Sequence, residues 1–419
     1  MSWEHLPELG REPLKEDRIV TTPVAGFSAG AVAAGIRGDG REDLALIAAA
    51  RPVAAAGVFT TSRLPAAPVL VSREHLAAGG GIRAVVANSG CANAATGPEG
   101  LEAARATCRA VAAALGCDPR QVLVCSTGVI GRPLPLERLT AAVPALAASL
   151  SPEGLPRAAA AIRTTDAFTK MARARTELAG RETLVVGLAK GAGMIRPQMA
   201  TMLAFLLTDA AVEPAALAGL VRRAAEASFN RATVDGDMST NDTLLLLASG
   251  EAGNPPLRAG DPALARLEEA VTRVCQELAA MLVADGEGAA HLVRVLVTGA
   301  PDQAAARALA YAVAHSPLCK TAFAGADPNW GRILAAAAAA AGLEDLPLVP
   351  EKTRLWIGEA LVAERGLPAG GAAERRAAEV MRRPRYQVRL ELGLGRGWWW
   401  VLTCDLGHPY VELNAEYHT

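Results

Sequence analysis

Residues 190–205 read Lys190-Gly-Ala-Gly-Met-Ile-Arg-Pro-Gln-Met-Ala-Thr-Met-Leu-Ala-Phe205, and they join two apolar runs of the chain. The run before them, 183–189, is typical of a buried strand, and the glycines break it at once. The last residues of this segment begin a second strand candidate, 201–207, which opens on Thr201 directly after Ala200. A glycine-broken strand, a proline and a new strand can hold one peptide bond in an unusual geometry.

The residue at the start of the second run, Thr201, has a possible chemical role. Its hydroxyl could attack the carbonyl of Ala200 and move the acyl group from nitrogen to oxygen, and hydrolysis would then free Thr201 as a new amino terminus. The released α-amino group, with an intrinsic pKa of about 8, could act as base for its own hydroxyl. A threonine that enters a strand is more often only a β-former, so the pattern alone leaves both interpretations open.

Strand-like and helix-like segments alternate through the rest of the chain, which indicates a mixed α/β protein. We expect strands in 26–35, 43–48, 82–87 and 121–125, and helices over 102–115, 136–150, 214–227, 262–283 and 302–314. Gly116 follows one helix as a left-handed cap, and Pro214 and Pro262 suit first helical turns. The runs 386–392 and 398–404 flank the glycine-rich segment 393–397, which predicts a hairpin.

Composition excludes several classes of protein. The 419 residues carry a formal charge of −1 with no basic stripe, so nucleic acid is not an expected partner. Seven cysteines without a CxxC pair indicate reduced thiols and no cysteine zinc site. The amino terminus has no apolar signal core, and the apolar run 333–343 is too short to cross a membrane. We expect a soluble, cytoplasmic protein without a membrane partner.

The domain organisation is expected to be a catalytic domain over 1–290 and a carboxyl-terminal lobe over 291–419. The acidic segment 235–242 does not match the twelve-residue calcium loop. If the loop began at Asp235, its sixth position would need Gly but has Thr240, and its twelfth would need Glu but has Leu246. A structural role near the active site suits this segment better. The glycines near Lys190 match neither the Walker pattern nor the dinucleotide fingerprint.

The run 190–205 resembles the cleavage segment of the ornithine acetyltransferase family, whose bifunctional members also make N-acetylglutamate. The resemblance extends over nearly the whole chain in family order. It includes Gly26-Phe-Ser-Ala-Gly-Ala31, Asn88-Ser-Gly-Cys-Ala-Asn-Ala94, Cys125-Ser-Thr-Gly-Val-Ile-Gly131, Thr164-Thr-Asp-Ala-Phe168, Phe229-Asn-Arg-Ala-Thr-Val-Asp-Gly-Asp-Met-Ser-Thr-Asn-Asp242, Asp285-Gly-Glu-Gly-Ala289, His315-Ser-Pro-Leu318 and Gly325-Ala-Asp-Pro-Asn-Trp-Gly-Arg-Ile333.

The resemblance implies a layered sandwich of sheets and helices of the N-terminal-nucleophile aminopeptidase and ornithine acetyltransferase type. It implies self-cleavage between Ala200 and Thr201, giving an α chain of residues 1–200 and a β chain of residues 201–419, with Thr201 as nucleophile. Thr127 and Gly128 match the oxyanion hole, which supplies donors to the negative oxygen of the tetrahedral intermediate. The positions that match substrate-binding residues are Thr164, Lys190, Thr201, Glu287, Asn414 and Thr419.

The implied reaction is a ping-pong transfer of acetyl from N2-acetylornithine to glutamate in arginine biosynthesis, with acetyl-CoA as a further donor in bifunctional members. No metal or organic cofactor is expected, and the family assembles as a heterotetramer of two α and two β chains. Lys190 suits an α-carboxylate and Glu287 an ammonium group. Asn414 and Thr419 stand near the carboxyl end, so the tail is expected to return to the active site.

Each position also has a plainer interpretation. Thr127 and Gly128 could form an ordinary turn, Glu287 a surface turn, and Asn414 part of a frayed tail. The sequence also departs from the family at Cys91, where Asn is frequent. This departure concerns substrate preference more than chemistry. Two alternatives stay open: a related N-terminal-nucleophile aminopeptidase or amidase that releases its acyl group to water, and a non-catalytic amino-acid-binding protein.

Overall fold

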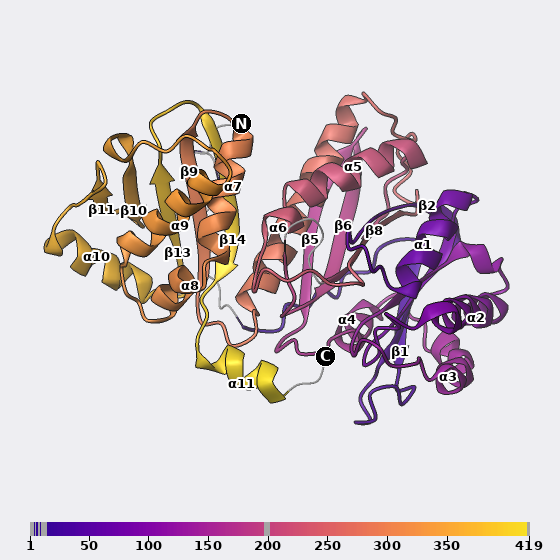
Figure 1. The fold of residues 1–419 in the computed structure, drawn as a ribbon. Coiled ribbons are helices and arrows are strands. Elements are labelled where there is room, and N and C mark those ends of the chain that lie inside the picture. Colours follow the sequence, from indigo (N-terminus) through magenta and orange to yellow (C-terminus); the bar gives the residue numbers. More distant parts are fainter. Residues whose placement is uncertain (1–3, 5, 7–8, 10–14, 197–201, 417–419) are drawn as a thin grey trace. The chain divides into compact units, whose positions relative to one another are not determined.

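The computed structural model describes the chain apart from residues 1–3, 5, 7–8, 10–14, 197–201 and 417–419 (Figure 1). The chain forms two compact units. The larger unit comprises Glu16–Asn230 and Asp237–Leu282, and the smaller comprises Arg231–Gly236, Val283–Tyr417 and the amino-terminal segment before Glu16.

The larger unit contains an eight-stranded sheet and most of the helices of the first two thirds of the chain. The strands are β1 Phe27–Val32, β2 Leu44–Phe59, β3 Ile82–Asn88, β4 Val122–Ser126, β5 Lys170–Leu178, β6 Arg181–Lys190, β7 Leu203–Thr208 and β8 Thr243–Ala248. The helices are α1 Ala67–Ala78, α2 Gly97–Leu115, α3 Leu136–Ala148, α4 Leu155–Ala161, α5 Pro214–Glu226 and α6 Pro262–Ala284. The expected strands and helices of this part of the chain are present.

The strand order is β4-β3-β2-β8-β7-β6-β5, and β1 pairs with β2. Strand β2 belongs to both halves of the sheet, because its first part pairs with β1 and β3 and its last part pairs with β8. The register shifts between Ala48 and Val53, where the two parts of β2 meet. The long strand therefore connects one half of the sheet to the other.

The two halves share one apolar core. Ile47 and Val85 of the first half are buried in the same cluster as Val186 and Phe205 of the second half. Side chains of alternate residues point to opposite faces of a strand, and Leu46 accordingly packs in a different cluster together with α2 and α3. On the second half, Val274 and Leu278 of α6 lie over Gly187 of β6. Sheets and helices thus lie in layers, and the predicted mixed α/β class is confirmed.

Local signals end and start the helices as expected. Gly116 has the left-handed φ of 64°, and its N–H donates to the carbonyl of Ala112, which ends α2. Pro214 lies in the first turn of α5, where a missing N–H costs nothing. All seven cysteines are free thiols. No helix among the described residues is both long and apolar enough to span a membrane.

The smaller unit contains a six-stranded sheet of order β12-β11-β10-β13-β9-β14. Its strands are β9 Leu292–Ala300, β10 Arg354–Ile357, β11 Ala360–Glu364, β12 Leu367–Pro368, β13 Arg385–Glu391 and β14 Gly397–Cys404. Its helices are α7 Gln303–His315, α8 Pro317–Ala324, α9 Trp330–Leu343, α10 Gly371–Met381 and α11 His408–Glu416. Helix α7 packs on β9 and β14 and helps to form the core of this unit (Figure 1).

The hairpin predicted for the last two strands is wrong. Strand β9 lies between β13 and β14, parallel to the first and antiparallel to the second. The glycine-rich segment instead crosses the end of β9, where the N–H groups of Leu394 and Gly395 donate to the carbonyl of Gly299. A Cβ at Gly395 would lie 2.5 Å from the carbonyl oxygen of Ala300, so the glycines permit this close crossing.

Candidate active site

Three neighbouring strands of the larger unit bring their ends to one edge of the sheet. Strand β6 runs antiparallel to β7, and β7 runs parallel to β8. The register aligns Lys190 with Leu203 and Leu203 with Thr243. The end of β6 and the beginnings of β7 and β8 therefore meet at this edge, where Met202 directly precedes β7.

Lys190 is the central group at this edge, and it is only 3% exposed. Its ammonium nitrogen donates to Thr164 Oγ1 at 2.8 Å and to Thr127 Oγ1 at 3.1 Å. An ammonium group can only donate, so both hydroxyl oxygens accept here. The hydroxyl protons of Thr127 and Thr164 are consequently free to point toward other acceptors.

Asp166 supports this arrangement from a position that sequence reasoning did not assign to the site. Its Oδ1 accepts from Lys170 Nζ and from the N–H of Gly191, both at 2.6 Å, and its Oδ2 lies 4.0 Å from Lys190 Nζ. Burial raises the pKa of this carboxyl, but Lys170, Lys190 and the Gly191 N–H lower the pKa by more, so the net shift is downward. Asp166 is therefore a buried carboxylate.

The turn after β4 carries the predicted oxyanion-hole pair. The N–H of Thr127 donates to the carbonyl of Asn88 at 2.9 Å, which joins the ends of β3 and β4. The side-chain amide of Asn241 donates to the carbonyl of Ser126 at 2.8 Å and holds the same turn. Gly128 has a φ of +133°, and a Cβ there would lie 2.3 Å from the carbonyl carbon of Gly90. Only glycine fits this position.

The turn presents two donors close together in the chain. The N–H of Gly128 has no acceptor among the residues that the structure describes, and the Thr127 hydroxyl proton is left free by Lys190. A buried hydroxyl and a backbone N–H are the kind of donors that stabilise a developing oxyanion. The geometry is therefore suited to the role that the resemblance implies for these two residues.

Several ionisable side chains are buried at this edge. Lys170 and Lys190 are cations, whereas Asp166 is the carboxylate that faces them. A second carboxyl, Asp242, is fully buried just before β8, and burial raises its pKa well above the ordinary value. Buried ammonium groups such as that of Lys190 are suited to binding an anionic group such as an amino-acid carboxylate.

Two further predicted residues lie together in the smaller unit. The side-chain amide of Asn414, on α11, donates to Glu287 Oε2 at 2.9 Å. Gly288 allows the helix to come this close, because its φ is +69° and a Cβ there would lie 2.5 Å from the Tyr410 nitrogen. Asn414 and Glu287 are thus hydrogen-bonded neighbours within the smaller unit.

The structure groups the predicted residues as Thr127, Gly128, Thr164 and Lys190 in the larger unit, and Glu287 and Asn414 in the smaller. Ala200, Thr201 and Thr419 lie outside the described residues. Sequence reasoning missed Asp166 and Lys170, which form a buried ion pair four positions apart. The signal was present as an aspartate in the Thr164-Thr-Asp block followed by a lysine that opens β5, a strand in which apolar and charged residues alternate.

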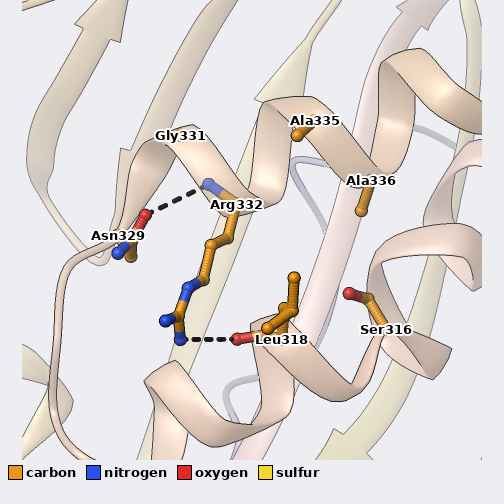
Figure 2. A pocket seen from close by; sticks show the side chains of 7 residues that line it. All are labelled: Ser316, Leu318, Asn329, Gly331, Arg332, Ala335 and Ala336. Atoms are coloured by element: carbon orange, nitrogen blue, oxygen red, sulfur yellow. Dashed lines mark hydrogen bonds between the residues drawn. The ribbon is translucent and has the colours of Figure 1, made fainter.

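A surface hollow of about 460 Å³ lies elsewhere, between α8 and α9 of the smaller unit. Figure 2 shows the side chain of Arg332 directed toward the Leu318 carbonyl, to which it donates at 3.1 Å, and Asn329 capping the start of α9. The residues that line the hollow include none of the predicted site residues. Among the described residues, no cluster of three or more His, Cys, Asp or Glu side chains could hold a metal ion.

A buried lysine that orients two threonine hydroxyls beside a glycine turn is suited to acyl transfer. A family model described as the ArgJ family matches residues 28–419. The arginine biosynthesis bifunctional protein ArgJ of Geobacter sulfurreducens is 48% identical over 397 residues, which are 94% of this chain and 100% of that protein. The protein of the same name from Methylococcus capsulatus is 47% identical over 95% of this chain and 96% of that protein.

The ornithine acetyltransferase of Mycobacterium tuberculosis, solved in complex with ornithine, is 40% identical and covers 44% of this chain and 95% of its own, with a TM-score of 0.38. The matches over nearly the full length show that the chain belongs to the ArgJ family. The resemblance found in the sequence is thereby confirmed.

Proposed function

We propose that this chain transfers acetyl from N2-acetylornithine to glutamate, through an acetyl ester on Thr201, after cleaving itself between Ala200 and Thr201. The products are ornithine and N-acetylglutamate. The full-length relatives are named for arginine biosynthesis, in agreement with this reaction. Their description as bifunctional supports acetyl-CoA as a second donor to the same threonine.

The observation that carries the proposal is the pair of hydrogen bonds from Lys190 to Thr127 and Thr164. They leave two hydroxyl protons directed away from the lysine, at the sheet edge where Met202 leads into β7. Met202 directly follows Thr201 in the sequence, and its own N–H is held by Asp242 at 3.1 Å. The proposed nucleophile is therefore one residue away from a fixed point of this edge.

In the proposed reaction, Thr201 Oγ attacks the acetyl carbonyl while the free α-amino group of Thr201 takes the hydroxyl proton. The Thr127 hydroxyl and the Gly128 N–H stabilise the negative oxygen of the tetrahedral intermediate. The proton then passes to the nitrogen of ornithine, which leaves. Glutamate attacks the acetyl ester in the reverse sequence and regenerates the threonine.

The remaining polar groups have binding roles in this proposal. The ammonium group of Lys190 attracts the α-carboxylate that acetylornithine and glutamate share, and Thr164 donates its hydroxyl proton to the same substrate. Glu287 binds the side-chain ammonium of ornithine, and we assign Asn414 and Thr419 to the same substrate. No step uses a metal or an organic cofactor. We further propose a cytoplasmic heterotetramer of two α and two β chains.

Denaturing electrophoresis with mass measurement tests the self-cleavage. We expect the purified wild type to give fragments of 200 and 219 residues, and Thr201→Ala to give one chain of 419 residues. A wild-type chain that stays intact while it transfers acetyl would overturn the assignment of Thr201. Light scattering on the same sample tests the assembly, since a heterotetramer contains twice the 43.2 kDa of one chain.

A partition experiment separates transfer from hydrolysis. Acetylornithine is incubated with the enzyme, with and without glutamate, and acetate and N-acetylglutamate are measured. We expect acetylglutamate to form and little acetate to appear. Rapid release of acetate without transfer would instead identify an amidase, and ornithine binding without turnover by an uncut chain would identify a binding protein.

A further inference from the structure

The turn that carries Glu287 joins the end of α6 to the start of β9, and a local hydrogen bond closes it. The N–H of Ala289 donates to the carbonyl of Gly286 at 2.8 Å, so Glu287 and Gly288 are the two central residues of a β-turn. Gly288 has a φ of +69°, and the third position of a type II turn requires such a positive φ. The backbone of this turn therefore fixes the direction in which the Glu287 side chain leaves the chain.

Asp405 holds the residues that follow this turn. It comes directly after β14, whose last residue, Cys404, pairs with Leu292 at the start of β9. Asp405 Oδ1 accepts the N–H groups of Ala290 and His291, both at 2.8 Å, and Asp405 Oδ2 lies 3.1 Å from His291 Nδ1. The Asp405 side chain is buried. The exit of the turn is thus hydrogen-bonded to one buried side chain.

The contacts of Asp405 favour its charged form. Burial raises the pKa of this carboxyl, but the hydrogen bonds from His291 and from the Ala290 N–H lower the pKa by more. A carboxylate can only accept hydrogen bonds, so the hydrogen between Asp405 Oδ2 and the His291 ring belongs to Nδ1. Both oxygens of the carboxylate are therefore engaged by the residues that follow the turn.

The segment after Asp405 returns to the same turn. Helix α11 begins three residues further on, and a Cβ at Gly288 would lie 2.5 Å from the backbone nitrogen of Tyr410 on this helix. Asn414 of the same helix donates to Glu287 Oε2 at 2.9 Å. Asp405 therefore lies where the chain leaves β14 for α11, and its hydrogen bonds tie the Glu287 turn to the root of the helix that contacts Glu287.

We infer that Asp405 is a positioning residue for the substrate: through the turn, it fixes the Glu287 carboxylate at the place where that carboxylate binds the side-chain ammonium of ornithine. The inference rests on the proposed function, which assigns this ammonium to Glu287. Asp405 acts through the turn and does not contact the substrate itself. Its effect is therefore specific for ligands that carry a side-chain ammonium group.

The test compares the binding of two ligands to the purified enzyme by titration calorimetry. Ornithine carries a side-chain ammonium group, and norvaline has the same carbon skeleton without it. We expect the wild type to prefer ornithine by about tenfold or more, since an ion pair with Glu287 is available to ornithine alone. Asp405→Ala should lose most of this preference through weaker ornithine binding, with the affinity for norvaline nearly unchanged.

Two further variants separate positioning from a general loss of structure. Asp405→Asn is the conservative variant, because its amide oxygen can still accept the N–H groups of Ala290 and His291, and we expect it to retain most of the preference. Asp302→Ala is the matched control. Asp302 accepts the N–H of Ala305 at 2.8 Å and caps α7 beyond the opposite end of β9, so its loss should leave the preference unchanged.

A milder variant keeps the inference testable if Asp405→Ala does not fold. His291→Phe removes the hydrogen bond from the ring and leaves the two backbone N–H groups on Asp405. We expect it to lower the preference for ornithine by about threefold. An unchanged preference in His291→Phe would then overturn the inference.

Glu287→Gln separates the inference from the proposed function. If the wild type binds ornithine and norvaline equally, or if Glu287→Gln keeps the preference, the assignment of Glu287 fails and the inference fails with it. If Glu287→Gln abolishes the preference while Asp405→Ala keeps it, the inference alone is overturned. A parallel fall in the affinity for both ligands in Asp405→Ala shows a general structural role and also overturns the inference.

Discussion

At the scale of single residues, the candidate site depends on hydroxyl groups whose direction is set by one lysine. Lys190 donates to Thr127 and Thr164 and accepts from neither, because an ammonium group has no acceptor. Each hydroxyl therefore keeps its proton for donation to another group. The effect of removing a hydroxyl should therefore appear in the chemical step more than in stability.

Thr127→Val tests this expectation, since it keeps the shape of the side chain and removes the hydroxyl. Loss of one oxyanion-hole donor typically lowers kcat by about 10²–10³-fold, and we expect a fall of that size in acetyl transfer with a nearly unchanged KM. Steady-state kinetics on cleaved enzyme provide the measurement. Thr127→Ser retains the hydroxyl and should keep most of the activity; equal activity of Val and wild type would rule out the oxyanion role.

The buried pair of Asp166 and Lys170 should make stability depend on pH. The folded pKa of Asp166 lies below the unfolded value of 3.8, so its carboxylate stabilises the folded chain above pH 3.8, and this contribution is lost as pH falls through the folded pKa. Breaking a buried pair typically costs about 3–5 kcal/mol, and we expect that loss for Asp166→Asn at pH 7.

Denaturant unfolding of wild type and Asp166→Asn between pH 7 and pH 3 measures this effect. The difference between the two proteins should shrink toward the acid end of the range. Asp39 is an exposed carboxyl whose pKa is lowered to about 2 by hydrogen bonds from Arg41, and Asp39→Asn should leave the midpoint nearly unchanged. A constant difference across the pH range would contradict the assigned charge of Asp166.

At the scale of elements, the site depends on how closely α6 packs on β6, the strand that ends at Lys190. A Cβ at Gly187 would lie 2.6 Å from Val274 Cγ1 and 2.8 Å from Leu278 Cδ1 of that helix. The glycine lets the helix approach the strand, so added volume must push the two elements apart or distort side chains.

Gly187→Ala should therefore destabilise the folded protein by about 1–3 kcal/mol and lower activity through displacement of Lys190. Thermal unfolding and acetyl transfer are measured on the same samples. Gly219→Ala is the matched control, because this helical glycine of α5 faces only the flexible end of Arg223 and alanine favours a helix. The interpretation fails if both variants unfold at the same temperature as wild type.

At the scale of the whole molecule, the proposed substrate residues come from both compact units. Lys190 and Thr164 belong to the larger unit, whereas Glu287 and Asn414 belong to the smaller. The hydrogen bond from Asn414 to Glu287 fixes the carboxylate that we assign to the ammonium of ornithine. Self-cleavage needs only the larger unit in our proposal, so the two functions should respond differently to a change on α11.

Asn414→Ala is expected to raise the KM for acetylornithine about tenfold, because a hydrogen bond to a charged group is worth about 1.5–3 kcal/mol. Cleavage at Ala200–Thr201 should remain complete. Glu412→Ala changes an exposed residue of the same helix and should leave both functions unchanged. An unaltered KM for Asn414→Ala would remove this residue from the substrate site.

Much of the fold was predictable, because strands and helices follow from local periodicity and from residues that start or end a helix, such as Pro214 and Gly116. The hairpin prediction failed because strand pairing is not local. A glycine-rich segment such as Gly393-Leu-Gly-Arg-Gly397 suits two arrangements equally well. It can join two strands that pair with each other, or it can cross the end of a third strand that lies between them. Strand β9, nearly a hundred residues earlier in the sequence, takes the place between them.

The sequence by itself determined the family and most element types, and its resemblance to the family suggested roles for Thr201, Thr127, Gly128 and Lys190, since these residues stand in contiguous blocks that match the family. Only the tertiary structure decided which groups surround Lys190 and that the pKa values of Asp166 and Asp242 shift in opposite directions. Burial and long-range contacts set a pKa, and neither can be read from neighbours in the sequence. The two buried carboxyls differ because two lysines face Asp166 closely, whereas Asp242 has an oxygen with no partner in the described part of the chain.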